Sequence, residues 1–216
     1  MPEPVIETHA EVAAAYDQLA ERWLDTNFPP TNGLPQHERA LAFLAGSGGY
    51  ALNVGCGAST RFNARLRERG LTPEGVDPSS RMVALARAAD PTMAVYHADV
   101  CTWEAPRTYR FITAWDSLWH VRLDLQRTVL LKLMAAMAPG GVLVFTAGGL
   151  DGASEHHDAH MGPSLYYATL GIPGLLGTLA DGGCLLRHME FDQWPERHLV
   201  VVAQRVVDGM PDGVSD

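Results

Sequence analysis

Small and acidic residues follow three short apolar runs of the sequence, where a nucleotide-like ligand could bind. Gly55 and Gly57 come directly after the run at 50–54, and Asp77 ends the next run. Glycine lets the backbone turn sharply and lets a ligand approach it closely. A carboxylate at Asp77 can accept two hydrogen bonds from a ribose diol. Asp99 and Val100 follow the third run, where a carboxylate and a backbone N–H can bind an adenine edge.

A purely structural interpretation of the same residues is open: the glycines make a tight turn, and Asp77 caps the helix that follows Pro78. The ordered context favours a ligand site instead. Strand, Gly-x-Gly, helix, strand and Asp follow one another, and then a helix, a strand and a second Asp. In an open α/β sheet the ligand lies beyond the carboxyl ends of the strands, where the strand order reverses.

A second group of residues able to do chemistry lies in the segment 155–160. His156, His157 and His160 fall within five positions, and Tyr166 and Tyr167 follow. Three interpretations stay open: a histidine acts as a general base or orients a substrate, the histidines hold a divalent metal, or the segment is a solvated loop. The spacing matches no specific metal motif.

His120, after the fourth predicted strand, is a further candidate base, and a structural role is equally open to it.

Alternating apolar runs and helical patterns must position these residues. Strands are predicted at 50–54, 74–77, 93–97, 110–115 and 142–146, and helices at 62–69, 80–89 and 124–137. A turn at Pro139-Gly140-Gly141 leads into the fifth strand, and a loop-rich stretch follows it. This alternation indicates parallel strands with crossover helices, hence a doubly wound α/β sheet. After a helix that begins at Pro173, strands at 184–191 and 198–205 have no helix between them, so they should pair antiparallel.

Composition narrows the classes of partner. The chain has 16 basic and 25 acidic side chains, for a formal net charge of −9. Nucleic acids and anionic membranes require a basic face, so neither is expected as a partner. No apolar run approaches the ~20 residues of a membrane-spanning helix, no secretory signal is recognised, and the three cysteines lack metal-ligand spacing. We expect a cytoplasmic protein, monomeric or homodimeric, that acts on a small molecule.

Three segments resemble successive motifs of the class I S-adenosylmethionine-dependent methyltransferases. They are Leu52-Asn53-Val54-Gly55-Cys56-Gly57, Gly75-Val76-Asp77-Pro78-Ser79 with Met82, and Ala138-Pro139-Gly140-Gly141. The segment 115–121 is similar to the stretch after the fourth strand in members that act on small molecules. The resemblance implies a Rossmann-like core of seven strands, mostly parallel with the last antiparallel. It also implies one domain over 1–206, with a helical lid at 1–48 and a core at 49–206; we expect 207–216 to be a flexible tail.

The resemblance further implies S-adenosyl-L-methionine as cofactor, S-adenosyl-L-homocysteine as product, and in-line methyl transfer to an oxygen or nitrogen of a small molecule. Residues implied or expected to contact the cofactor are Tyr16, Asn53, Gly55, Cys56, Gly57, Asp77, Pro78, Met82, Asp99, Val100 and Trp115. Candidate substrate contacts are Asp116, Trp119, Tyr166 and Tyr167, and candidate catalytic residues are His120, His156, His157 and His160.

The sequence also departs from the family pattern. Asn53 stands where an acidic residue is usual, Arg110 stands where an aspartate is usual, and the segment 58–61 lacks a third glycine. A dinucleotide dehydrogenase shares the glycine turn and the acidic residue, but the absent third glycine disfavours it. The alternatives are a non-catalytic protein that binds S-adenosylmethionine or a nucleotide, and a metal-dependent enzyme that uses the cluster at 156–160.

Overall fold

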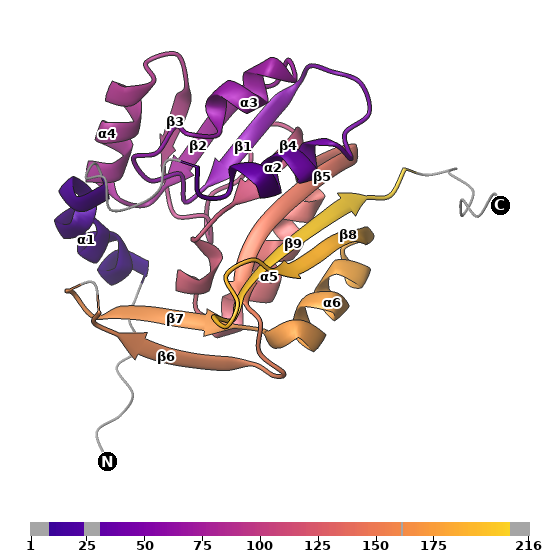
Figure 1. The fold of residues 1–216 in the computed structure, drawn as a ribbon. Helices are drawn as coiled ribbons and strands as arrows, with labels where there is room; N and C mark the ends of the chain where they lie inside the picture. Colours follow the sequence, from indigo (N-terminus) through magenta and orange to yellow (C-terminus); the bar gives the residue numbers. More distant parts are fainter. Residues whose placement is uncertain (1–8, 24–30, 161, 208–216) are drawn as a thin grey trace.

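A twisted seven-stranded sheet runs through the centre of the computed structural model, which describes residues 9–23, 31–160 and 162–207 (Figure 1). The strand order is β3-β2-β1-β4-β5-β9-β8. The strands are β1 (Tyr50–Val54), β2 (Thr72–Asp77), β3 (Ala94–His97), β4 (Tyr109–Ala114), β5 (Met137–Gly148), β8 (Cys184–Phe191) and β9 (His198–Arg205). Strand β9 is antiparallel to both β5 and β8, whereas the remaining pairs are parallel. The expected seven-stranded, mostly parallel sheet with an antiparallel last strand is confirmed.

Helices cover both faces of this sheet, which is why its strands are apolar on both sides. On one face lie α2 (Leu34–Leu41), α3 (Asn63–Glu68) and α4 (Ser80–Ala89), and on the other lie α5 (Leu123–Ala135) and α6 (Gly171–Asp181). Strand β1 shows the alternation: Ala51 packs with the α2 and α3 side, and Leu52 packs with the α5 and α6 side. Among the helices that the structure describes, none has the length and apolar character needed to traverse a bilayer.

The first helix lies across the end of the molecule rather than on a face of the sheet. Helix α1 (His9–Leu19) continues into a 3-10 turn (Ala20–Trp23) and packs against both α4 and β7 (Figure 1). Its buried residues Val12, Ala15 and Leu19 contact Leu165. The described part of the predicted lid contains α1, the 3-10 turn and α2, and α2 lies on a face of the sheet. Of the predicted tail, 207–216, only Val207 lies within the described residues.

Two local expectations are wrong. The segment around 155–160 is not a loop: β6 (Ser154–Asp158) and β7 (Leu165–Thr169) form a separate antiparallel hairpin. Residues 155–158 of β6 are exposed and polar, so the alternation of apolar residues that marks a strand is missing there. The turn at 139–141 lies inside β5, where the pairing with β4 shifts register between Tyr109 and Phe111. The bulge lets β5 continue through the glycines.

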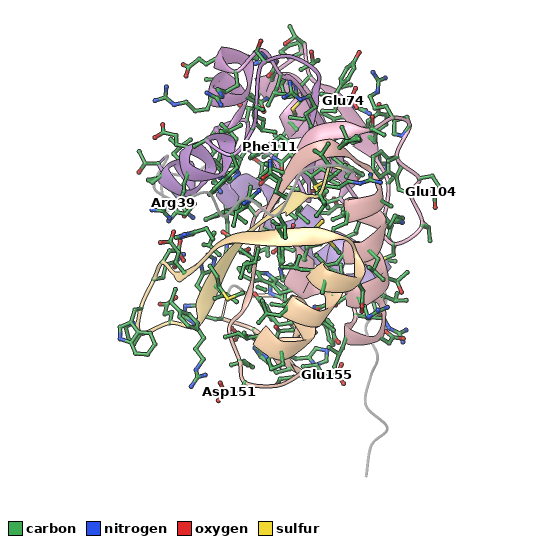
Figure 2. The ribbon with its side chains drawn as sticks, turned by 90° about the vertical axis from the view of Figure 1, so that its right-hand side faces the viewer. Arg39, Glu74, Glu104, Phe111, Asp151 and Glu155 are labelled. Carbon is green, nitrogen blue, oxygen red and sulfur yellow. The ribbon has the colours of Figure 1, made fainter. Side chains whose placement is uncertain are left out.

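Phe111 provides a test of the core on the α2 and α3 side. Figure 2 shows Phe111 inside the molecule, with Arg39, Glu104 and Asp151 at its edges. Phe111 is fully buried, so Phe111→Ala should lower the free energy of unfolding by about 3–5 kcal/mol. The control is Phe191→Ala, because Phe191 is 36% exposed and its removal should cost about 1 kcal/mol or less. Urea unfolding measures both, and equal losses for the two variants would contradict this account of the core.

Candidate functional site

The turn after β1 requires glycine. Gly55 and Gly57 have φ of 63° and 54°, in the left-handed region that favours glycine. A Cβ on Gly55 would lie 2.4 Å from the Cβ of Ser117, which follows the neighbouring strand β4. A Cβ on Gly57 would meet no heavy atom nearer than Met82 Sδ at 4.0 Å. Gly55 therefore allows two strand ends to approach each other, and Gly57 leaves open space.

Asp77, at the end of β2, holds this turn in place. One carboxylate oxygen accepts the backbone N–H of Gly57 at 2.8 Å, and the other accepts that of Ser79 at 2.9 Å. Burial raises the pKa of Asp77 to about 6, against the effect of these two hydrogen bonds. The sequence-based alternative that Asp77 caps the following helix is partly realised, but the N-cap itself is Ser79, whose hydroxyl accepts the Met82 N–H.

Most of the predicted cofactor contacts line one depression, here called the main cleft. It lies at the carboxyl ends of β1, β2 and β4, between α1 and the glycine turn. Its lining comprises Val12, Tyr16, Asn32, Asn53, Gly55, Cys56, Gly57, Ser59, Arg61, Phe62, Asp77, Pro78, Met82, Trp115, Asp116, Ser117 and His120. The predictions for Asp99 and Val100 fall in an adjoining inner pocket, which shares Gly55, Pro78 and His120 with the main cleft.

Helix α1 is attached to the core by polar contacts as well as by packing. The Asp17 carboxylate accepts hydrogen bonds from the Ser79 hydroxyl at 2.5 Å and from the Arg81 backbone N–H at 2.9 Å, both at the start of α4. A carboxylate at a helix N-terminus is favoured by the unpaired N–H groups and the helix dipole. Tyr16, the residue before Asp17, lines the main cleft.

His120 is held as a neutral acceptor. The Trp119 indole N–H, which can only donate, lies 3.0 Å from His120 Nε2, and the Tyr16 hydroxyl lies 2.7 Å from the same atom. The Nδ1–H therefore donates to the Tyr166 carbonyl at 2.8 Å. Burial lowers the pKa of His120 to about 4. This arrangement favours an anchoring role for His120 over the predicted role of general base.

The remaining aromatic candidates line a third depression, here called the outer hollow, between the hairpin and β9. Trp119, His156, Tyr167 and His198 contribute to it, together with Glu196 and Arg197. The rings of His156 and Tyr167 stack across the hairpin with centroids 5.4 Å apart. The ring of Tyr167 also approaches that of His120, with centroids 4.7 Å apart. The outer hollow therefore lies next to the contact between His120 and Tyr16 of α1.

Three predicted site residues line none of these depressions. His157 and His160 are exposed, and His157 lies against Tyr166 on the opposite face of the hairpin. Tyr166 is buried, and its hydroxyl donates to Glu155 at 2.5 Å and accepts the Leu123 N–H at 3.0 Å. Within the described residues, no group of three or more His, Cys, Asp or Glu side chains could hold a metal ion.

The structure adds three residues that the sequence did not single out. Arg61 lines the main cleft, and its buried Nε has no hydrogen-bond partner among the residues that the structure describes. His198 bonds Asp116 at 2.9 Å and Asp192 at 2.5 Å. Arg61 stands four residues after Gly57, a weak signal of its place, whereas His198 and Asp192 are far in sequence from Asp116 and carry no signal.

The sequence of residues 31–195 matches the profile of a family described as a methyltransferase domain. The chain belongs to this methyltransferase family. The match covers both the glycine turn and the strands that form the main cleft, so the resemblance drawn from the motifs is confirmed. No curated protein sequence matches the methyltransferase significantly.

Solved structures share the fold of this methyltransferase at low sequence identity. A 1,6-didemethyltoxoflavin-N1-methyltransferase from Burkholderia thailandensis, solved with 1,6-didemethyltoxoflavin and S-adenosylhomocysteine, is 17% identical, with 95% of this chain and 93% of that chain covered and a TM-score of 0.73. The amino pentose methyltransferase CalS10 from Micromonospora echinaspora, bound to S-adenosylmethionine, is 16% identical, with 95% and 100% covered and a TM-score of 0.65. The N-methyltransferase NodS from Bradyrhizobium japonicum, in complex with S-adenosylhomocysteine, is 17% identical, with 88% and 98% covered and a TM-score of 0.63.

The neutral state of His120 gives the methyltransferase a defined acid sensitivity. Its pKa is about 4 in the folded chain, against an ordinary 6.5. In this pH range His120 is protonated in the unfolded chain but not in the folded chain. The free energy of unfolding therefore falls as the pH drops from about 6.5 towards 4. Between about pH 7 and pH 5 the wild type should lose about 2 kcal/mol more unfolding free energy than His120→Gln. Urea unfolding at the two pH values measures this, with His188→Gln, at a partly exposed histidine, as control. Equal pH dependence in wild type and His120→Gln would contradict the neutral assignment.

Proposed function

We propose that this methyltransferase binds S-adenosylmethionine in the main cleft and transfers its methyl group to an oxygen or nitrogen of a small molecule. The observation that carries the proposal is the main cleft itself. A left-handed glycine turn, the Asp77 carboxylate and the inner pocket beside Asp99 meet there beneath Tyr16 of α1. The adenosyl compounds bound in the structural neighbours support it.

The residues present fit the adenosine half of this cofactor. Each Asp77 oxygen already accepts one backbone N–H, and a carboxylate oxygen has two lone pairs, so capacity remains for a ribose diol. Asp99 uses one oxygen for the Cys101 N–H at 2.8 Å and can offer the other to an adenine amino group. Val100 and Leu118 supply apolar walls to the same pocket.

The methionine half requires groups for an ammonium and a carboxylate. Arg61 supplies a cation to the main cleft. Its buried Nε–H has no acceptor among the described residues, and leaving a buried donor without an acceptor is costly. A carboxylate of the ligand would supply that acceptor. Asn53, also in the cleft, offers a carbonyl oxygen to the ammonium in place of the family's usual carboxylate. These two side chains line the same cleft as Asp77, and the space beside Gly57 is open, so the cleft can take an extended ligand.

We assign the acceptor molecule to the outer hollow. His198, which lines this hollow, forms a hydrogen bond with Asp116, which lines the main cleft, so the two depressions are neighbours. Bound S-adenosylmethionine supplies an electrophilic methyl group on a positively charged sulfur. The chain contributes alignment of the acceptor with that methyl group, and helix α1 and Tyr16 exclude water from above the cleft. The stacked rings of His156 and Tyr167 and the tilted ring of Trp119 suit a flat small molecule.

Calorimetric titration with S-adenosylmethionine, S-adenosylhomocysteine and NAD tests the proposal. We expect micromolar binding of the two adenosyl compounds and none of NAD, because the turn lacks the third glycine that a pyrophosphate requires. S-adenosylhomocysteine release in the presence of phenols, N-heterocycles and primary amines then identifies the acceptor class. Absence of binding by the adenosyl compounds would overturn the proposal.

Asp77→Asn should weaken S-adenosylhomocysteine binding about tenfold or more, since charge-assisted hydrogen bonds contribute about 1.5–3 kcal/mol. The amide keeps the side-chain volume, but only one of its oxygen positions can still accept a hydrogen bond. Calorimetry gives the dissociation constant, and circular dichroism checks that the variant is folded. Asp181→Asn, which alters an exposed ion pair with Arg127, serves as control. Unchanged affinity in Asp77→Asn would refute the ribose assignment.

Arg61→Gln should separate the two halves of the cofactor. Its affinity for S-adenosylhomocysteine should fall about tenfold, because the carboxylate loses a charged donor. Its affinity for 5′-methylthioadenosine, which lacks the amino-acid end, should stay within about threefold of wild type. Arg65→Gln is the matched control, as Arg65 lies exposed nearby and pairs with Glu68. Equal losses for both ligands would show that Arg61 shapes the cleft without binding the carboxylate.

A further inference from the structure

Asp116 has a backbone conformation that only a few residue types tolerate. It directly follows Trp115 at the end of the β4 segment, and its φ of 53° makes it the one described non-glycine residue in the left-handed region. Strained backbone of this kind clusters at functional sites. The Asp116 N–H donates to Thr146 Oγ1 at 2.8 Å, so the turn is fixed to β5. The side chain is 35% exposed and lines the main cleft.

A relay of charged groups extends from Asp116 away from the cleft. Asp116 Oδ1 lies 2.9 Å from His198 Nε2, and His198 Nδ1 lies 2.5 Å from Asp192 Oδ1. Asp192 is itself held by the Gln36 side-chain amide, which donates to its second oxygen at 3.1 Å. His198 begins β9, and Asp192 lies in the connection that precedes it. The relay therefore joins the far end of the sheet to the main cleft.

His198 is doubly protonated in this setting. Both ring nitrogens face carboxylate oxygens, which can only accept, so each nitrogen donates a hydrogen. Burial alone would lower the pKa of His198, but the hydrogen bonds to Asp116 and Asp192 outweigh it and raise the pKa. Two carboxylates around one imidazolium leave a net charge of −1. Of these three residues, it is the Asp116 carboxylate, and not the His198 ring, that lines the main cleft.

Other polar groups around Asp116 are engaged elsewhere. His120 Nε2 accepts from both Tyr16 and Trp119, so its lone pair is occupied. His156 lines the outer hollow but belongs to the exposed strand β6. Arg61 is the cation that faces Asp116 across the cleft. Asp116 Oδ1 takes the hydrogen bonds from His198 and Thr146, and the Asp116 side chain lines the main cleft. Oδ2 is therefore the oxygen that remains available to a molecule bound there.

We infer that Asp116 accepts the proton that the acceptor molecule loses during methyl transfer, and that His198 and Asp192 position its carboxylate. The inference rests on the proposed function. The acceptor lone pair forms the new bond to the methyl carbon, while the carbon–sulfur bond breaks and leaves its electron pair on the sulfur. The acceptor's N–H or O–H proton passes to Asp116 Oδ2. The substrate class is accordingly an amine, N-heterocycle or alcohol that bears a hydrogen on its nucleophilic atom.

Kinetics on the acceptor with the highest turnover in the panel provide the first test. Asp116→Asn should lower kcat about 100-fold, in the range that general base catalysis contributes. Its S-adenosylhomocysteine affinity should stay within about threefold of wild type. His198→Gln and Asp192→Asn should lower kcat about tenfold with little change in KM, because they disturb only the position of the base. His188→Gln, at a partly exposed position, and Asp181→Asn, at an exposed one, are the controls and should leave kcat unchanged.

Nuclear magnetic resonance of 15N-histidine-labelled protein tests the relay without any acceptor. At about neutral pH, His198 should show two ring N–H signals in the wild type and lose one of them in Asp192→Asn. A neutral His198 in the wild type would overturn the relay, and an Asp116→Asn variant with more than half the wild-type kcat would overturn the base. Failure of the proposed function is distinguished by calorimetry, since it would abolish wild-type binding of S-adenosylhomocysteine whatever the state of His198.

Discussion

The buried carboxylate of Asp77 is the constraint on which the main cleft depends. It joins the end of β2 to the turn after β1 and to the start of α4 through the N–H groups of Gly57 and Ser79. Burial disfavours its charge and raises its pKa to about 6. The hydrogen bonds from the two backbone N–H groups stabilise the charged form of Asp77 and so oppose the effect of burial. Each N–H group gains the acceptor that it would otherwise lack. The Asp77 side chain therefore fixes both the glycine turn and the start of α4, and it also supplies the local charge. A ligand in the main cleft contacts the region that all three features shape.

His120 connects that cleft to the rest of the molecule through its uncharged state. An imidazolium could not accept from both Tyr16 and Trp119, and burial excludes it at neutral pH. Tyr16 belongs to the lid helix, while Trp119 lines the outer hollow. The same ring nitrogen thus contacts Tyr16 of helix α1, which lines the main cleft, and Trp119, which lines the outer hollow. His120 lies after β4, where a general base was a candidate, but here it accepts and donates hydrogen bonds that link different elements. Its low pKa keeps the ring neutral, and so able to accept.

The sequence supported the prediction of the core more fully than that of the periphery. Strand β1 and helix α4 were placed with the bounds that the structure shows, because buried parallel strands and a capped amphipathic helix have strong local patterns. The hairpin of β6 and β7 was missed, since backbone pairing rather than apolar alternation holds β6. Arg61 precedes α3 and lines the cleft, a place that no strong local pattern of the sequence predicts. His198 and Asp192 could not be recognised at all, because only the antiparallel return of β9 brings them to Asp116.

The cost of the relay is itself informative about its role. Taking the His198 imidazolium and the Asp192 carboxylate out of water costs several kcal/mol per ion. Their mutual attraction offsets this cost only where further hydrogen bonds complete the group. Gln36 and Thr146 supply such bonds at its two ends. Apolar side chains of similar volume would commonly be as stable at these positions, so stability alone gives no reason for three charges there. A carboxylate that lines the main cleft and is held by His198 meets a requirement of proton transfer that an apolar side chain could not.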